Sequence, residues 1–286
     1  MVAFVFPGQG SQKRGMGEDL FDLKEYTAAE REIDELVGYS MRRLCKEDPQ
    51  DQLKDTRYTQ PSLYVVNALY LLKHTLAFGS PTHAAGHSLG EYNALLAAGV
   101  FDFMTGLRLV KKRGELMAQA KSGGMGAVIG LSRAAIETVI QSNGLSGVDV
   151  ANFNSPSQTV ISGPVAELTR AGQLLEQAGA RMYMPLQVSA AFHSRYMAEY
   201  ADEFARFLQP FTFAAPKIPV VSNVTAQPYP ADGEAIKSLL VRQITQSVQW
   251  TQSVRYLLAQ DVTDFKETGP GNVLTRLIQQ IRQEND

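Results

Sequence analysis

The chain has 286 residues, 44% of them hydrophobic, which is enough to bury the core of one large domain or of a main domain with an insert. Its 27 basic and 29 acidic residues nearly cancel, and no uninterrupted apolar stretch of about 18 residues occurs, so we expect neither a nucleic-acid partner nor a membrane helix. Cys45 is the only cysteine and the four histidines form no ligand-like cluster, so we expect no intrachain disulfide, no metal site and a reducing, cytoplasmic location.

The first 120 residues predict strands and helices in alternation. Residues 2–6 form a β-branched and aromatic run that stops at Pro7-Gly8, which is typical of a buried strand that leads into a turn. Apolar spacing then predicts a helix over 59–78, a short strand over 82–86, and helices over 91–98 and 105–121. Such alternation favours a parallel sheet that helices cover on both faces.

Residues 125–187 follow a different order. Strand-like and helical segments succeed one another there as β-α-β-β-α-β, the ferredoxin-like pattern, with Ser132 as the N-cap of the first helix. Gly123-Gly124 marks an entry to this stretch. We therefore predict an α/β fold in two parts: a main subdomain with a parallel sheet, residues 1–124 and 188–286, and a ferredoxin-like insert, residues 125–187.

After the insert the main pattern resumes. An amphipathic helix is predicted over 195–208, where apolar residues recur on one face. The remaining expected elements are a strand over 217–224, helices over 238–244 and 248–260, and a strand, glycine turn and helix over 262–281.

The sequence Gly86-His87-Ser88-Leu89-Gly90 lies between an expected strand and an expected helix, and it matches the G-x-S-x-G pattern of a nucleophilic serine. Glycines at the flanks let strand and helix pass close together, so that the turn lifts the hydroxyl clear of the sheet. The backbone N–H of Leu89 then faces the place of a developing oxyanion. The alternative is that Ser88 only caps the helix. The strand and helix on either side favour the nucleophile.

A nucleophilic serine needs a base, and four histidines are available. His74 lies on a buried helix, His83 begins the strand, and His87 would point away from Ser88. His193 ends a predicted strand and follows the serine in chain order, so it is our candidate base; a surface histidine at a helix start is the alternative. No suitably placed acidic residue lies between the two. We expect a Ser-His dyad whose histidine is oriented by a backbone carbonyl or an amide.

Arg113 stands in the apolar stripe of its predicted helix, with Leu109 and Val110 on one side and Leu116 and Met117 on the other. A guanidinium there is costly unless a carboxylate meets it. A structural ion pair, or a side chain whose tip reaches solvent, would explain it. The other interpretation is that the carboxylate arrives with the substrate, which the planar fork of arginine binds through two hydrogen bonds.

The glycine turn near the N-terminus, PGQGSQKRGMG, is not a dinucleotide site. A G-x-G-x-x-G pattern needs its third glycine at position 13, where the chain has Lys13. The segment is better interpreted as a tight strand-to-helix turn. Gln9 within it could present a second oxyanion N–H beside the serine, and a plain turn is the equal alternative.

Seven blocks spread over nearly the whole chain carry a further signal: FVFPGQGSQ, GHSLGEYNALLAAG, LVKKRGELM, NFNSPSQTVISG, AAFHS, VRQITQSVQW and ETGPGNVLTRL. Together and in this order they resemble the malonyl-CoA:acyl carrier protein transacylases. The resemblance implies an α/β-hydrolase-like main subdomain with a ferredoxin-like insert. It also implies transfer of a malonyl group from coenzyme A to the phosphopantetheine thiol of an acyl carrier protein, in fatty-acid or polyketide synthesis, without a cofactor.

The resemblance assigns roles to individual residues. It implies that Ser88 is acylated and that His193 acts as base and acid. It implies that Arg113 holds the malonyl carboxylate, that the backbone N–H groups of Gln9 and Leu89 form the oxyanion hole, and that the main-chain carbonyl of Gln243 orients the histidine.

Two details near the histidine bear on selectivity and pathway. Malonyl-selective relatives tend to have an aromatic residue before the histidine, and Phe192 could fill the space of an α-methyl group. Ala190-Ala191 departs from many relatives of fatty-acid synthesis, which gives a slight lean toward free-standing transacylases of polyketide synthases.

Two other classes of protein compete with this interpretation. A serine hydrolase, such as a thioesterase that releases acyl groups from carrier protein or coenzyme A, would share Ser88 and His193 but would not need Arg113. A non-catalytic module that binds carrier proteins would keep the surface and lose the dyad, whereas this chain has the dyad intact.

Overall fold

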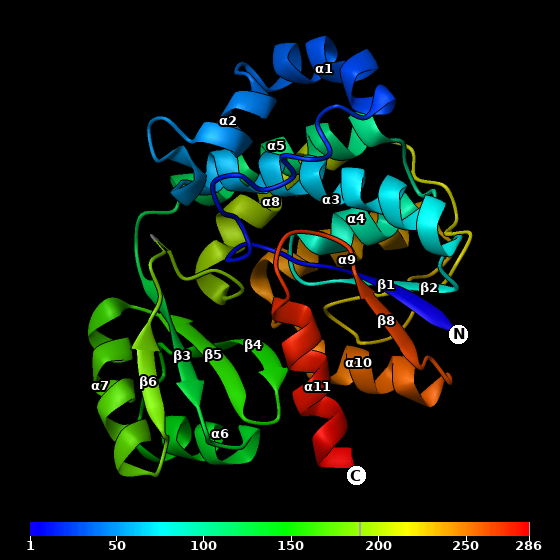
Figure 1. The fold of residues 1–286 in the computed structure, drawn as a ribbon. Helices are drawn as coiled ribbons and strands as arrows, with labels where there is room; N and C mark the ends of the chain where they lie inside the picture. Colours follow the sequence, from blue (N-terminus) through cyan, green and yellow to red (C-terminus); the bar gives the residue numbers. More distant parts are fainter. Residues whose placement is uncertain (189, 286) are drawn as a thin grey trace.

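The computed structural model describes residues 1–188 and 190–285, and within these ranges the strands form two separate sheets (Figure 1). The first sheet is parallel throughout, in the order β7-β2-β1-β8. Its strands are β1 (Val2–Phe6), β2 (His83–Gly86), β7 (Val220–Val221) and β8 (Asp264–Glu267).

Alternate side chains of the central strand β1 face two different cores. Phe4 and Phe6 pack into a large cluster formed with helices that include α3, α4, α5, α8 and α9, whereas Ala3 and Val5 face a smaller cluster formed with α10 and α11. The predicted parallel sheet with helices on both faces is therefore confirmed. The helices are α1 (Lys24–Val37), α2 (Met41–Glu47), α3 (Thr56–Phe78), α4 (Gly90–Ala97), α5 (Phe103–Gln119), α6 (Arg133–Ser142), α7 (Val165–Gln177), α8 (Ala198–Leu208), α9 (Gly233–Thr245), α10 (Trp250–Ala259) and α11 (Val273–Asn285), with 3-10 turns at Gln52–Lys54 and Arg195–Met197.

The second sheet is antiparallel, in the order β4-β5-β3-β6 (Figure 1). With α6 and α7 between its strands in the chain, this is the ferredoxin-like arrangement that the sequence predicts. The hydroxyl of Ser132 caps α6 by accepting a hydrogen bond from the N–H of Ala135. The strands of this antiparallel sheet are β3 (Gly124–Ile129), β4 (Asp149–Ser155), β5 (Gln158–Gly163) and β6 (Met182–Pro185). The division of the chain at residues 125 and 187 stays a prediction.

The antiparallel sheet is joined to the main part through β4. The N–H of Phe153 donates to the carbonyl of Val248, and the N–H of Val248 donates to the carbonyl of Ala151, both at 2.9 Å. Ser247 adds a hydroxyl that donates to the carbonyl of Val150 at 2.5 Å. These bonds set the edge of the small sheet against the segment between α9 and α10.

Several boundaries differ from the sequence-based expectation. Helix α3 begins at Thr56, three residues early, because Asp55 caps it by accepting from the N–H of Arg57 at 2.9 Å. Strand β7 is only two residues long, since Asn223 beyond it bonds to other segments instead of a ladder. Helices α1 and α2 lie in a stretch for which we predict no element from the sequence, although Tyr26, Ile33 and Val37 are buried on α1.

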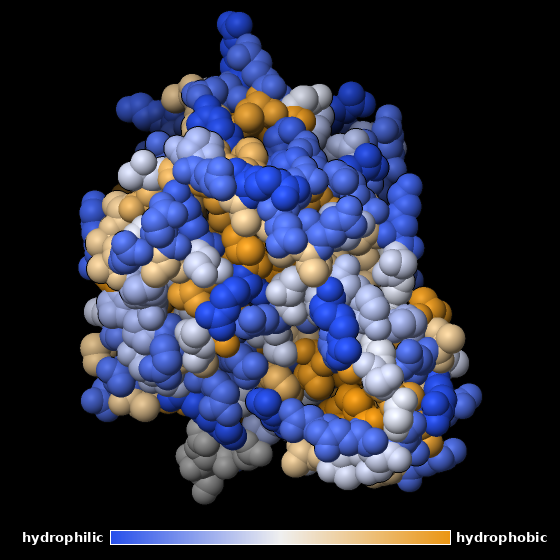
Figure 2. Space-filling view, turned by 180° about the vertical axis from the view of Figure 1, so that it is seen from behind, coloured by the Kyte–Doolittle hydropathy of each residue, from blue (hydrophilic) through white to orange (hydrophobic). Residues whose placement is uncertain are grey.

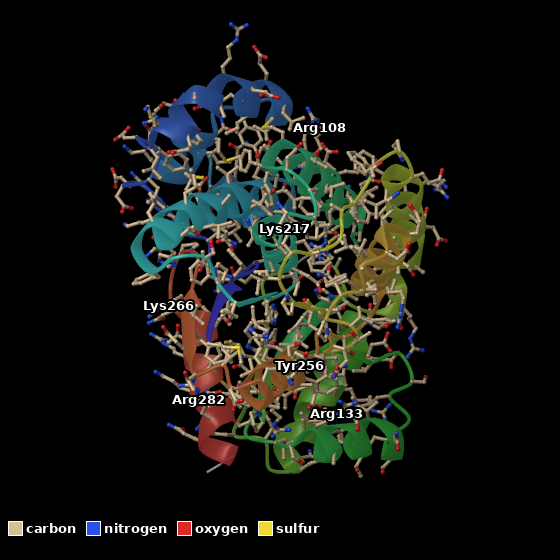
Figure 3. The ribbon with its side chains drawn as sticks, turned by 90° about the vertical axis from the view of Figure 1, so that its right-hand side faces the viewer. Arg108, Arg133, Lys217, Tyr256, Lys266 and Arg282 are labelled. Atoms are coloured by element: carbon tan, nitrogen blue, oxygen red, sulfur yellow. The ribbon has the colours of Figure 1, made fainter. Side chains whose placement is uncertain are left out.

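The face of the molecule opposite to that of Figure 1 has no single apolar patch (Figure 2). From behind, hydrophilic side chains cover most of the molecule and the apolar ones lie in separate groups (Figure 2). Arg108, Lys217, Lys266 and Arg282 lie at different heights along one side (Figure 3). None of the helices in the described part of the chain is long and apolar enough to cross a membrane.

Candidate active site

Ser88 sits on the turn between β2 and α4, with a left-handed backbone at φ 50°. Close backbone packing forces glycine at its neighbours: a Cβ on Gly90 would lie 2.0 Å from the carbonyl oxygen of Phe6, and one on Gly8 would lie 2.3 Å from that of His87. Helix α4 begins at Gly90 with Leu89 in the N-cap position. Among the described residues, no backbone N–H of α4 donates to the Ser88 hydroxyl, which contacts side chains from other elements instead.

One of these side chains is that of His193, which is 5% exposed and not the surface residue of the alternative. Its Nε2 lies 2.8 Å from Ser88 Oγ, and its Nδ1 lies 2.8 Å from the carbonyl oxygen of Gln243. A carbonyl only accepts, so Nδ1 carries the proton and Nε2 presents a lone pair to the serine hydroxyl. His87 points elsewhere, with its Nε2 2.8 Å from Asn154 Oδ1.

The surroundings of His193 keep its ring neutral. Burial, aided by the charge of Arg113, lowers the pKa of His193 to about 3, against the carbonyl of Gln243, which favours the charged form. The ring is thus ready to accept a proton at neutral pH. The carbonyl of Gln243 would stabilise the imidazolium that forms.

Arg113, on α5, is 1% exposed and points into the same site. It donates to Gln60 Oε1 at 2.8 Å, to Gln243 Oε1 at 2.9 Å and to Ser88 Oγ at 3.1 Å. None of the ion pairs found among residues 1–188 and 190–285 includes this guanidinium. The two alternative interpretations of Arg113, a structural ion pair and a tip that reaches solvent, are therefore wrong. Burial lowers the pKa of the Arg113 guanidinium.

Three further residues shape the site and were missed by sequence reasoning. Gln60 on α3 and Glu91 on α4 are buried polar residues among apolar neighbours. Asn223, also buried, accepts from the N–H of Ser88 at 2.7 Å and donates to the carbonyl of Gly86 at 2.6 Å, so it holds the serine turn. A polar residue on the buried face of a predicted helix was the signal that could have found Gln60 and Glu91.

Glu91 is fully buried three residues after the serine. Burial raises the pKa of Glu91 to about 7, and the N–H of Asn223 and the amide of Gln243 oppose that rise by favouring the ionised form. Its Oε1 accepts from the N–H of Asn223 at 2.7 Å, and its Oε2 accepts from Nε2 of Gln243.

A cavity of about 110 Å³ lies at the serine, the histidine and the arginine. Its lining includes Ser88, His193 and Arg113, together with Gln9, Leu89 and Phe192. The backbone N–H groups of Gln9 and Leu89 have no acceptor within the part of the chain that the structure describes. Phe192, 5% exposed, adds an aromatic wall. The cavity thus combines a hydroxyl, a neutral imidazole, a guanidinium without a carboxylate and two unpaired N–H groups.

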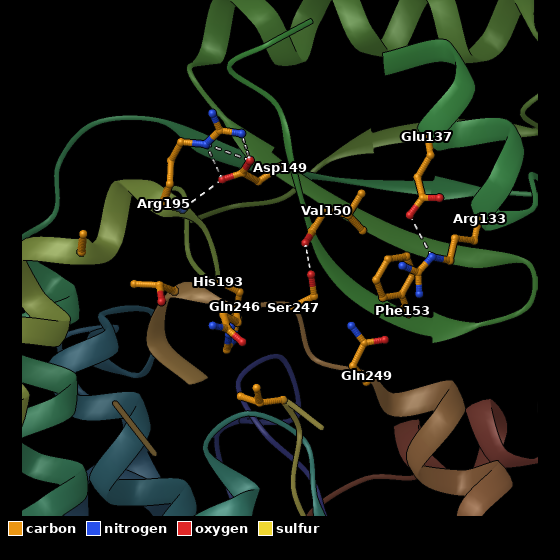
Figure 4. A pocket seen from close by; sticks show the side chains of 13 residues that line it. Arg133, Glu137, Asp149, Val150, Phe153, His193, Arg195, Gln246, Ser247 and Gln249 are labelled. Carbon is orange, nitrogen blue, oxygen red and sulfur yellow. Dashed lines mark hydrogen bonds and ion pairs between the residues drawn. The ribbon is translucent and has the colours of Figure 1, made fainter. Parts of the chain in front are cut away.

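A larger cleft of about 630 Å³ reaches the cavity at His193, which lines both (Figure 4). The cleft runs between the small sheet and the segment that carries Gln246 and Ser247. Its charged side chains are paired, Arg195 with Asp149 and Arg133 with Glu137. In the ranges described, no group of three or more His, Cys, Asp or Glu residues is placed to hold a metal ion.

Comparisons with known proteins agree with this geometry. Residues 3–286 match the family model described as an acyl transferase domain. The chain is 53% identical to a polyketide biosynthesis malonyl CoA-acyl carrier protein transacylase, BaeC, of Bacillus velezensis, over 100% of this chain and 98% of the relative. It is 42% identical to the malonyl CoA-acyl carrier protein transacylase of Escherichia coli K12, over 98% and 92% of the two chains.

The fold has equally similar solved relatives. A crystal structure of a malonyl CoA-acyl carrier protein transacylase from Burkholderia pseudomallei superposes with a TM-score of 0.94 at 47% identity, over 99% of this chain and 98% of that one. The chain therefore belongs to the acyl transferase family, among the malonyl CoA-acyl carrier protein transacylases.

Proposed function

We propose that this protein is a malonyl-CoA:acyl carrier protein S-malonyltransferase that works through a malonyl-serine intermediate. The observation that carries the proposal is the buried guanidinium of Arg113, which lies 3.1 Å from Ser88 Oγ and contacts only uncharged acceptors. A serine nucleophile beside an arginine without a carboxylate suits an acyl donor that brings its own free acid.

In the first half-reaction, Ser88 Oγ attacks the thioester carbonyl carbon of malonyl-CoA while its proton passes to Nε2 of His193. The carbonyl oxygen becomes negative and is stabilised by the backbone N–H groups of Gln9 and Leu89. The C–S bond then breaks, and the thiol of coenzyme A leaves with the proton from Nε2. The hydrogen bond from Nδ1 to Gln243 holds the ring in the productive tautomer throughout.

In the second half-reaction, the phosphopantetheine thiol of an acyl carrier protein gives its proton to Nε2 and attacks the serine ester. The ester C–O bond breaks, and Ser88 recovers its proton from the histidine. The cleft that reaches His193 supplies a path for the pantetheine arm of both coenzyme A and the carrier protein. The reaction, as proposed, uses side chains and backbone groups of the protein, a thioester donor and a thiol acceptor, without a cofactor.

Two residues are proposed to choose the donor. Arg113 binds the malonyl carboxylate through its fork, and Phe192 fills the space that an α-methyl group would need. The small cavity of about 110 Å³ is consistent with a short acyl group.

The pathway is fatty-acid or polyketide synthesis. The higher identity to the polyketide relative, 53% against 42% for the Escherichia coli one, supports the lean toward polyketide synthesis. We propose a cytoplasmic location, which suits a lone, buried cysteine, Cys45.

The alternative, a serine hydrolase or thioesterase, makes the same acyl-enzyme and differs only in what removes it. The test follows the malonylated protein in buffer and with a pantetheine thiol or holo carrier protein. We expect slow loss of the acyl group to water and fast loss to the thiol. Equal, rapid loss in buffer alone would identify a hydrolase instead.

A further inference from the structure

Glu91 is the only acidic side chain found in hydrogen-bond contact with the groups that hold Arg113, among the residues the structure describes, and it does not touch the arginine itself. It is 0% exposed and sits in the first turn of α4. Both of its carboxylate oxygens face N–H donors, one from the backbone of Asn223 and one from the side chain of Gln243. No step of the transfer reaction uses this carboxylate directly.

The amide of Gln243 lies between the acid and the arginine. Its Nε2 donates to Glu91 Oε2 and to the carbonyl oxygen of Ser88, the latter at 2.8 Å. The carbonyl of Ser88 has no proton to give, and neither has the carboxylate of Glu91 when it is ionised, so the NH₂ group points toward both. The opposite end of the amide, Oε1, is then left to face Arg113, which donates to it at 2.9 Å. Glu91 thus sets which way the amide of Gln243 points.

The orientation of that amide matters for an arginine that must bind a carboxylate. All three acceptors on Arg113 are uncharged oxygens, from Gln60, Gln243 and Ser88. A carboxylate in direct contact would form a charge-assisted pair and compete with the acid of the donor. The amide of Gln243 lies between the Glu91 carboxylate and the Arg113 guanidinium. No carboxylate in the described part of the chain therefore contacts the guanidinium, whose positive charge remains available to the acid of the donor.

We propose that Glu91 is a positioning residue for donor selection, which fixes the amide of Gln243 so that an uncharged oxygen, and not a carboxylate, faces Arg113. The proposal rests on the proposed malonyl transfer and extends it from the arginine to the residues behind it. A merely structural role, in which Glu91 only ties Asn223 to α4, is the competing explanation.

Two variants separate these explanations. In Glu91→Gln, Oε1 of the new amide still accepts from Asn223, but its NH₂ now faces the NH₂ of Gln243, so the amide of Gln243 turns and presents donors to Arg113. The double variant Glu91→Gln/Gln243→Glu exchanges the two side chains. It restores a matched hydrogen bond between positions 91 and 243 and keeps the net charge, but it places the carboxylate against Arg113.

The measurement is the rate of serine acylation by malonyl-CoA and by acetyl-CoA at pH 8, which is above the raised pKa of about 7 of Glu91, together with the melting temperature of each protein. Glu91→Gln should lower the malonyl rate by about 10- to 100-fold and change the acetyl rate by less than about 3-fold. The exchanged variant should recover melting temperature relative to Glu91→Gln and still show a malonyl-to-acetyl ratio at least about 30-fold below wild type. Loss of the hydrogen bond from Gln243 to the carbonyl of Ser88 would slow acylation by both donors. That common effect cancels in the malonyl-to-acetyl ratio of rates.

Glu203→Gln is the matched control, because Glu203 pairs with Lys112 at 2.6 Å on the surface, away from the cavity. It should leave the ratio unchanged. If the exchanged variant recovered both the melting temperature and the malonyl preference, Glu91 would have a structural role only. If the exchanged protein did not fold, an unchanged malonyl-to-acetyl ratio in Glu91→Gln would lead to the same conclusion. A wild type without malonyl preference would overturn the proposed function itself, which is a different result from a malonyl-preferring wild type whose variants keep that preference.

Discussion

Ser88 and His193 meet across a 2.8 Å contact, and both hold their backbone in the left-handed region, at φ 50° and 55°. A residue with a Cβ costs roughly 1–2 kcal/mol in that conformation, so the fold tolerates strain at the two residues proposed to do the chemistry. Strained backbone conformations of this kind cluster at active sites, where they lower the stability of the fold and hold the reacting side chains in position.

The strain at Ser88 can be measured with two inactive variants. Ser88→Gly removes the Cβ, whereas Ser88→Ala keeps it, and neither retains the hydroxyl. We expect Ser88→Gly to melt about 2 °C above Ser88→Ala, which corresponds to about 1 kcal/mol in a chain of this size. Equal melting temperatures would show that the turn carries no strain from the Cβ.

The histidine should stay neutral over a wide range of pH. With the pKa of His193 lowered to about 3, a ring NMR titration of labelled histidines should show one ring, absent in His193→Gln, that keeps its proton on Nδ1 and does not titrate between pH 8 and pH 5. A midpoint near 6.5 for that ring would contradict the account.

The same shift has a consequence for stability. Between pH 6.5 and about 3 the unfolded chain binds a proton at His193 that the folded chain does not bind. The contribution of this group therefore falls as the pH falls through that window, by up to about 1.4 kcal/mol per pH unit. His193→Gln should lose this part of the acid sensitivity in denaturant titrations.

Arg113 should control the choice of donor. A charge-assisted bidentate pair in a partly dry pocket contributes about 2–4 kcal/mol, so Arg113→Ala should lower kcat/KM for malonyl-CoA by roughly 30- to 1,000-fold and leave acetyl transfer similar or improved. Arg113→Lys should recover little, because a point charge does not reproduce the planar fork. Equal losses for both donors, with a lower melting temperature, would make Arg113 a scaffold residue.

Phe192 should limit branching at the α-carbon of the donor. Replacing the aromatic ring by a small side chain opens space beside the acyl group, and one methyl group changes discrimination by about 10- to 200-fold in such pockets. Phe192→Ser should raise the methylmalonyl-to-malonyl ratio of acylation rates within that range. Phe213→Leu is a suitable control, since Phe213 is buried in the core and does not line the cavity. An unchanged ratio in Phe192→Ser would remove this residue from donor selection.

The parts of the site with a local signal were predictable from the sequence. The glycines around Ser88 predict the turn, and Arg113 is recognisable because it interrupts the apolar stripe of a predicted helix. The order of strands in the antiparallel sheet also follows from the β-α-β-β-α-β pattern. These features depend on neighbours within one element or one motif, where spacing carries the information.

The network behind Arg113 was not predictable in that way. Glu91 bonds to Asn223 and Gln243, which lie 132 and 152 residues away in the chain. The Glu91 side chain on α4 accepts hydrogen bonds from Gln243 on α9 and from Asn223 beyond β7 only in the folded chain. The position of Glu91 on a predicted helix could mark it as a buried polar residue, but nothing in the sequence identifies its partners. The role of the Gln243 carbonyl was implied by the family resemblance, and no residue pattern pointed to it.

In the proposed reaction, Ser88 carries the malonyl group between donor and acceptor. The decisive measurement of this role is the intact mass of the protein after brief mixing with malonyl-CoA, with Ser88→Ala under the same conditions. We expect a gain of one malonyl group on the wild type and no gain on Ser88→Ala. A wild type that gains no mass, or a Ser88→Ala protein that is acylated as fast as the wild type, would contradict it.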